Sequence, residues 1–159
     1  VETILRAHSD RKPADLKLAA QLSEGSPGLA LELDLEDAVE KRRTALRILE
    51  RAARGQGFAQ LFADTAALAK DRGSSFEELM GVFYGLLSDL LEINAGIRSP
   101  RLRNPHLSKE LQALAGLVDR AWVGRAIDGM DKLAAGVRRN LNRQLGLDSL
   151  ATSLVRSNG

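Results

Sequence analysis

Residues 75–91, which read Ser-Phe-Glu-Glu-Leu-Met-Gly-Val-Phe-Tyr-Gly-Leu-Leu-Ser-Asp-Leu-Leu, carry the strongest helical pattern in the chain. Ser75 and Glu78 stand at the spacing of a capping box, which predicts that the helix begins here. Because its apolar face is wide, we expect this helix at the centre of an all-α helical bundle. The residues of that face recur at helical spacing: Phe76, Leu79, Met80, Phe83, Leu86, Leu87, Leu90 and Leu91.

Two glycines, Gly81 and Gly85, stand one helical turn apart on the same helix. In a membrane this spacing is typical of helix dimerisation. The charged residues that flank the helix favour instead a close crossing with another helix inside the bundle.

The composition favours helices around an aliphatic core. Leu and Ala dominate, and aromatic residues make up only 4% of the 159 residues. The net charge of +2 gives weak support for contact with nucleic acid. The absence of cysteine excludes disulfides, thiolate catalysis and cysteine-based zinc sites. The absence of cysteine also fits a cytoplasmic protein. No apolar run reaches the roughly 18 residues of a membrane span, so we expect no membrane contact.

Turn residues divide the rest of the chain. Residues 94–106 form an irregular segment, and Asn140 and Asn142 are expected as capping residues before the last helix. The chain opens on Val1 within a helical pattern, and we expect it to be a piece of a longer protein. After the end of a helix at residues 1–8, the expected helical segments are 14–24, 27–33, 35–54, 58–70, 107–118, 122–137 and 145–155.

The stretch Gly25-Ser26-Pro27-Gly28-Leu29 predicts a tight break between two helices. Gly25 suits the left-handed position after a helix end, Ser26 can cap the next helix, and Pro27 fits its first turn. The same residue types occur in ordinary helix-turn-helix corners. The position of the stretch, directly before a long helical region, makes it informative.

No combination of residues indicates catalysis. His8 and His106 have no second metal-type ligand at helical spacing, and both are predicted to be solvated loop residues. Asp89 and Glu92 are predicted to lie on a solvated helix surface. We therefore expect no catalytic residue, no metal ion and no cofactor, and no enzymatic activity of this chain by itself.

Basic residues gather in three groups, which are Lys41-Arg42-Arg43, Arg98 with Arg101 and Arg103, and Arg138-Arg139 with Arg143. Since the C-termini of helices favour cations, each group fits a solvated helix end. The second group, Arg98 with Arg101 and Arg103, lies in the irregular segment. Its arginines are therefore the better candidates for contact with an acidic partner.

Several stretches, taken in order, carry a resemblance to a known family. They are the Gly25–Leu31 break after a helical remnant, a charged helix, the leucine-rich helix ending near Leu90-Leu91, Leu114-Ala115 after an irregular segment, and the closing run Asn140–Leu150. This order resembles the C-terminal part of bacterial DNA polymerase III clamp-loader subunits, most closely those of the delta-prime type. The resemblance spans nearly the whole chain.

The resemblance implies a division of the chain and a role. Residues 1–33 would be the end of the lid subdomain of an AAA+ module, and residues 35–159 the helical collar domain through which loader subunits assemble. The loader places the sliding clamp on primed DNA during DNA replication, within the DNA polymerase III holoenzyme, a nucleotidyltransferase assembly. The implied partners are the gamma/tau and delta subunits, with primed DNA and the sliding clamp met only through the whole complex.

Leu29 departs from the ATP-hydrolysing relatives, which commonly carry at this position an arginine that senses the nucleotide phosphates. An apolar side chain cannot contact phosphate, which favours the delta-prime type over the gamma/tau motor subunit. The C-terminal region of gamma/tau and an unrelated helical scaffold stay open as alternatives, as does self-association. The expected subunit interface comprises positions near the last two helices: Arg138, Arg139, Leu141 and Arg143.

Overall fold

The computed structural model describes residues 3, 10–23, 25–71, 75–138 and 142–155. Within these ranges the regular structure is entirely helical, so the predicted all-α helical bundle is confirmed. None of the helices in the same ranges is long and apolar enough to pass through a membrane. The elements are α2 (Pro13–Leu22), α3 (Pro27–Glu32), α4 (Leu35–Arg54), α5 (Phe58–Lys70), α6 (Phe76–Asn94), the 3-10 helix η1 (Pro105–Leu107), α7 (Ser108–Ala115), α8 (Arg120–Val137) and α9 (Arg143–Ser153).

Helix α6 lies at the centre of the bundle, as the sequence predicts. The capping box at its start is complete, because Glu78 N donates to Ser75 Oγ at 3.1 Å and Ser75 N donates to Glu78 Oε2 at 2.8 Å. Its apolar face packs against α4, α7 and α8. Phe83, Leu86 and Leu87 are completely enclosed.

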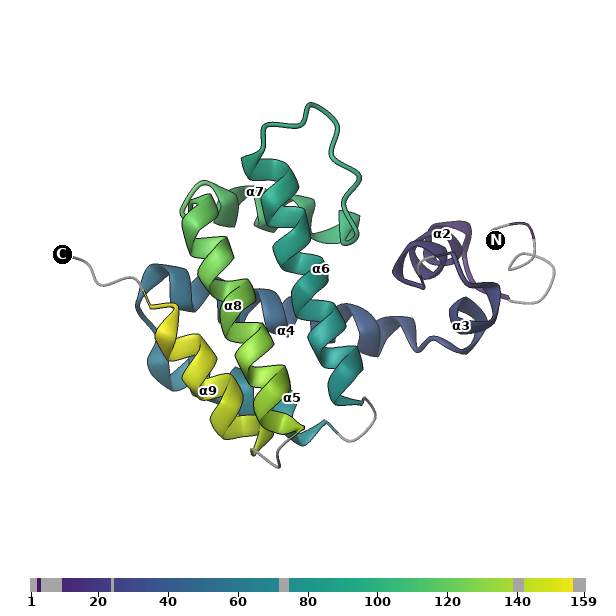
Figure 1. Ribbon diagram of the computed structural model, residues 1–159. Coiled ribbons are helices and arrows are strands. Elements are labelled where there is room, and N and C mark those ends of the chain that lie inside the picture. Colours follow the sequence, from purple (N-terminus) through teal and green to yellow (C-terminus); the bar gives the residue numbers. More distant parts are fainter. Residues whose placement is uncertain (1–2, 4–9, 24, 72–74, 139–141, 156–159) are drawn as a thin grey trace.

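The remaining helices surround α6 in a simple arrangement (Figure 1). Helix α8 runs beside α6 in the opposite direction, and α9 lies on the far side of α8. Helix α4 crosses behind them, and α5 packs against both α4 and α9. One continuous apolar core connects all these helices.

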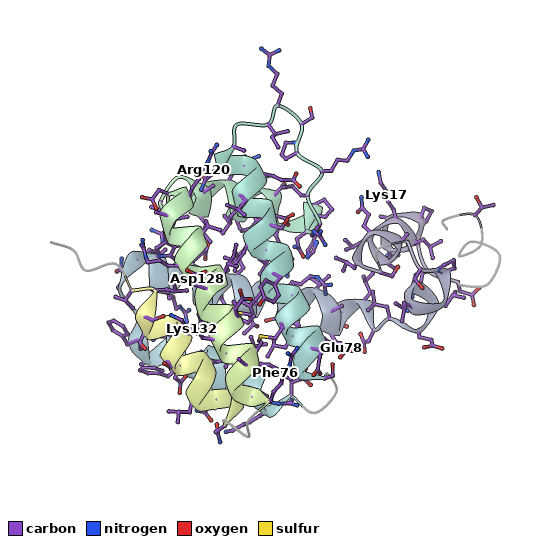
Figure 2. The ribbon with its side chains drawn as sticks, in the orientation of Figure 1. Lys17, Phe76, Glu78, Arg120, Asp128 and Lys132 are labelled. Atoms are coloured by element: carbon purple, nitrogen blue, oxygen red, sulfur yellow. The ribbon has the colours of Figure 1, made fainter. Side chains whose placement is uncertain are left out.

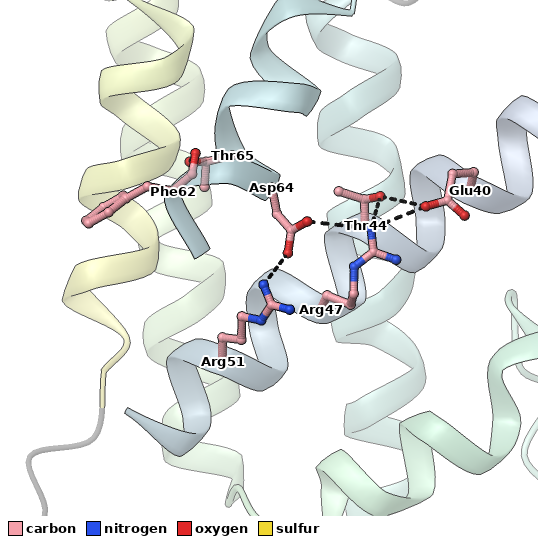
Figure 3. Close-up of polar contacts among 7 residues, drawn as sticks. All are labelled: Glu40, Thr44, Arg47, Arg51, Phe62, Asp64 and Thr65. Carbon is pink, nitrogen blue, oxygen red and sulfur yellow. Dashed lines mark hydrogen bonds and ion pairs between the residues drawn. The ribbon is translucent and has the colours of Figure 1, made fainter. Parts of the chain in front are cut away.

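Ion pairs join the outer surfaces of α4 and α5. Asp64 of α5 lies between two arginines of α4, 2.8 Å from Arg51 and 3.5 Å from Arg47 (Figure 3). Arg47 also contacts Glu40 at 3.2 Å. Ion pairs at the surface contribute about 0–1 kcal/mol each, so we expect them to fix the relative position of the helices more than they stabilise the fold.

Helices α8 and α9 approach each other closely at Gly129. A Cβ atom at Gly129 would come within 2.5 Å of Leu150 Cδ1. The predicted close crossing at Gly81 and Gly85 is wrong, because a Cβ at Gly81 would meet no described atom within 4 Å. Gly85 lies instead beside Asn104, whose Nδ2 would be 3.5 Å from a Cβ there. A returning loop, and not a helix, covers this glycine.

A second, smaller apolar cluster lies outside the bundle. Leu16 and Ala19 of α2 pack against Ala30 of α3, and Leu35 in the first turn of α4 also contacts this cluster. The Arg11 guanidinium donates to the carbonyl oxygens at the end of α3, from Nη1 to Ala30 O at 2.9 Å and from Nη2 to Leu33 O at 2.6 Å. We call α2 and α3 the small helix pair. The chain passes from this pair directly into α4.

Replacing Phe83 with Ala tests the central position of α6. Phe83 is 0% exposed, and we expect the substitution to lower the free energy of unfolding by about 3–5 kcal/mol through lost burial and the cavity left behind. Phe62→Ala is the matched control, because Phe62 is 39% exposed and should cost clearly less. Urea unfolding followed by circular dichroism measures both. Equal losses in the two variants would show that α6 is misplaced.

Candidate functional site

The predicted corner lies between α2 and α3. Gly25 has the left-handed φ of 83°, and its N–H donates to Ala20 O at 3.1 Å. Ser26 takes the N-cap position, as predicted, and Ala30 N donates to its carbonyl oxygen at 3.0 Å. The Ser26 side chain makes no capping hydrogen bond within the described structure. Pro27 occupies the first turn, where no N–H is needed.

Leu29 projects from the first turn of α3. It is 61% exposed, whereas the next residue, Ala30, is completely buried against α2. An exposed apolar side chain therefore occupies this corner, and it has no group that binds phosphate.

The first basic group, Lys41-Arg42-Arg43, makes contacts within the protein. The Lys41 ammonium lies 2.9 Å from carboxylates of both Asp37 and Asp71. Arg42 is half-buried, and burial lowers the pKa of its guanidinium. The predicted role at a helix end is wrong, since α4 continues to Arg54.

The second basic group lies on a loop that projects from the end of the bundle (Figure 1). We call residues 95–104 the arginine loop. Its three arginines, Arg98, Arg101 and Arg103, have exposed side chains. Leu102 packs against the main core from within the loop. The loop is therefore attached to the bundle while its cations face solvent.

A buried carboxylate holds the end of the arginine loop. Asp89 Oδ1 accepts a hydrogen bond from Arg103 N at 2.7 Å, and Oδ2 accepts from Asn104 N at 3.0 Å and from Asn104 Nδ2 at 2.8 Å. Burial raises the pKa of the Asp89 carboxyl, and the hydrogen bonds from Arg103 and Asn104 oppose this rise.

The prediction that Asp89 lies on a solvated surface is wrong, since the residue is 0% exposed. Glu92, three positions later, is half-buried. The sequence does contain a signal, because Asp89 falls within the apolar face of α6, three residues after Leu86 and directly before Leu90. A charged residue at such a position needs buried hydrogen-bond donors.

The predicted interface residues lie around the turn between α8 and α9. Arg138 is exposed at the C-terminal end of α8, and Arg139 and Leu141 lie outside the described residues. The Arg143 guanidinium is 5.6 Å from the centre of the Phe76 ring, a cation–π contact between the first turns of α9 and α6. Among the predicted interface residues, Arg143 therefore already contacts a side chain of the same chain, Phe76.

Asn142 caps α9, as predicted, because its Oδ1 accepts a hydrogen bond from Leu145 N at 3.1 Å. The corresponding prediction for Asn140 falls outside the described residues.

His106 differs from its prediction as a solvated loop residue. It lies in η1, both ring nitrogens are buried, and neither has a hydrogen-bond partner within the described structure. Burial lowers the pKa of the ring to about 4, and the charges of Arg42 and Arg43 act in the same direction. His106 is therefore neutral at pH 7. The prediction for His8 lies outside the described residues.

A groove of about 390 Å³ lies between α8 and α9. Figure 2 shows Asp128 and Lys132 on the part of α8 that borders it. Its lining combines charged residues with buried leucines, among them Leu133 and Leu150.

Comparison with known proteins adds no relative: no family model matches the chain, and no curated protein or solved structure matches it. Among the residues that the structure describes, no three His, Asp or Glu side chains are grouped so that they could hold a metal ion.

Replacing Asp89 with Asn tests how the arginine loop is held. One carboxylate oxygen becomes an NH₂ group that faces N–H donors, so we expect the free energy of unfolding to fall by about 1–3 kcal/mol. Trypsin should also cut faster after Arg98 or Arg101 under native conditions. Glu92→Gln, on the same helix, should change the stability by less than about 0.5 kcal/mol. If both variants match the unsubstituted protein in stability and cleavage rate, Asp89 does not hold the loop.

His106 should make the fold sensitive to acid. The folded pKa of about 4 lies below the unfolded value, so the unfolded chain binds more protons and stability falls as the pH drops from about 6.5 to 4. In His106→Leu this part of the loss disappears, and we expect the unsubstituted protein to lose about 1 kcal/mol more stability than the variant between pH 7 and pH 5, allowing for solvent screening. Urea titrations across this range measure it, and parallel curves would contradict it.

Proposed function

We propose that this chain is the C-terminal part of a DNA polymerase III clamp-loader subunit of the delta-prime type. Residues 35–159 would form the collar that holds the loader ring together, and residues 1–33 would be the end of the AAA+ lid. In this role the chain catalyses no reaction itself. It supports a cytoplasmic assembly that places the sliding clamp on primed DNA.

One observation carries the proposal: the small helix pair contains the Gly25-Ser26-Pro27 corner and leads straight into the bundle. The pair has its own apolar cluster, while α4 to α9 share another. Leu35 connects the two parts, since it contacts the small cluster at the start of the 20-residue helix α4. This order, a small helix pair followed by a larger bundle, is the order expected for the end of a lid subdomain followed by a collar domain.

The exposed Leu29 supports the delta-prime type over the motor subunit. A phosphate-sensing residue must donate hydrogen bonds or carry positive charge, and Leu29 does neither. ATP hydrolysis by the longer parent protein would overturn this part of the proposal.

A collar works through its outer surface. In a ring of subunits each neighbour meets a different face of the bundle, which is a heterologous contact. Arg138, exposed at the end of α8, is the described residue that we propose for such a contact. The proposed partners are the collar regions of gamma/tau and delta.

Size-exclusion chromatography at micromolar concentration tests the assembly role. We expect the chain to co-elute with the gamma/tau and delta collar regions encoded in the same genome. Arg138→Glu should weaken this complex about tenfold or more, because it places a carboxylate in the contact. Arg98→Ala is the control, since Arg98 lies on the arginine loop, away from the end of α8 that carries Arg138 (Figure 1). Separate elution of the unsubstituted chain would overturn the proposal.

A further inference from the structure

Positive charge is concentrated around the arginine loop. Residues 93–109 contain Arg98, Arg101, Arg103 and Lys109, and no Asp or Glu. The whole chain has a net charge of only +2, so the rest of the molecule is slightly acidic. Residues 93–109 are therefore strongly basic, although the total charge of the chain is nearly balanced.

The arginine loop presents this charge from a fixed base. Asp89 holds its end through three hydrogen bonds, and at its start Asn94 Nδ2 donates to Val118 O at 3.4 Å. Within the described part of the chain, Arg98 and Arg101 form no ion pair, and both side chains are exposed. Because the loop backbone is fixed at both ends, it loses less conformational entropy when its arginines meet an anion.

Neighbouring elements add cations, while Glu92 and Glu110 border the basic segment in sequence. The Arg120 guanidinium donates from Nη2 to Asn94 O at 3.3 Å, which brings it to the start of the loop (Figure 2). On the other side, Arg42 and Arg103 line the same small cavity of about 50 Å³. Asp89 of α6 contacts the end of the loop, but it is buried and already accepts hydrogen bonds.

The other two basic groups lack this combination. Lys41 is paired with two carboxylates, and Arg143 lies over the Phe76 ring. The arginine loop is therefore the basic group of the described chain that is both concentrated and presented to solvent.

We propose that the arginine loop binds the phosphate backbone of double-stranded nucleic acid, without sequence preference. Guanidinium groups pair with successive phosphates through charge-assisted hydrogen bonds. The loop projects from the bundle (Figure 1), so its arginines can reach the surface of a duplex. A duplex carries one negative charge per about 1.7 Å of its axis and so offers several phosphates to a cluster of three arginines. This proposal stands independently of the collar role, since it concerns a contact made by the chain alone.

Fluorescence anisotropy with a labelled DNA duplex tests the proposal on the full chain. We expect a Kd in the micromolar to 100 μM range at low salt, typical of non-specific binding, with affinity falling steeply as salt rises. Arg98→Ala with Arg101→Ala should weaken binding about tenfold at 50 mM KCl and reduce the salt slope by about 2. Arg54→Ala with Arg125→Ala is the matched control, because it removes two exposed arginines elsewhere and should leave the affinity within about twofold.

Thermal unfolding of each variant checks that the fold is kept, since exposed substitutions change stability little. Three results would overturn the proposal: no binding of the unsubstituted chain to the duplex, equal weakening in the loop variant and its control, or displacement of the duplex by poly-glutamate of matched charge at an equal concentration. The last result would assign the loop to acidic proteins.

Discussion

The enclosure of α6 by α4, α7 and α8 is the interaction on which the rest of the molecule depends. Leu86, Leu87 and Leu90 are completely enclosed in this helix, together with Phe83. Burying one leucine contributes about 1.5–3 kcal/mol relative to leaving it exposed. Since three helices pack against α6 directly, its position determines where each of them lies.

The same helix also carries the polar group that places the loop. An ionised carboxylate buried without donors is strongly unfavourable, so Asp89 can enter the core only when the backbone of Arg103 and Asn104 is in place. Closure of the core and docking of the loop are therefore coupled. Through Asp89, the position of the exposed arginines in residues 95–104 therefore depends on the packing of the core, although these residues form no regular helix.

The sequence predicts the helices well because their pattern is local. The apolar spacing of α6, the capping box at Ser75 and the cap at Asn142 each involve residues within a few positions of one another. The environments of Asp89, His106 and Gly85 depend on segments that return from elsewhere in the chain. Periodicity shows which face of a helix is apolar, but it does not show which loop covers a polar residue or a glycine on that face. The interface prediction has the same limit, since Arg143 contacts Phe76, 67 residues away in sequence. This contact depends on how α9 packs against α5 and α8.

The position of Trp122 has a practical consequence. It is the single tryptophan of the chain, it is 1% exposed, and its indole Nε1 donates to Leu154 O at 3.0 Å, just after the end of α9. A tryptophan side chain in such a site is shielded from water on every side. Its emission therefore reports on whether the last helix is seated, and it allows the closing step of the chain to be followed optically without a label.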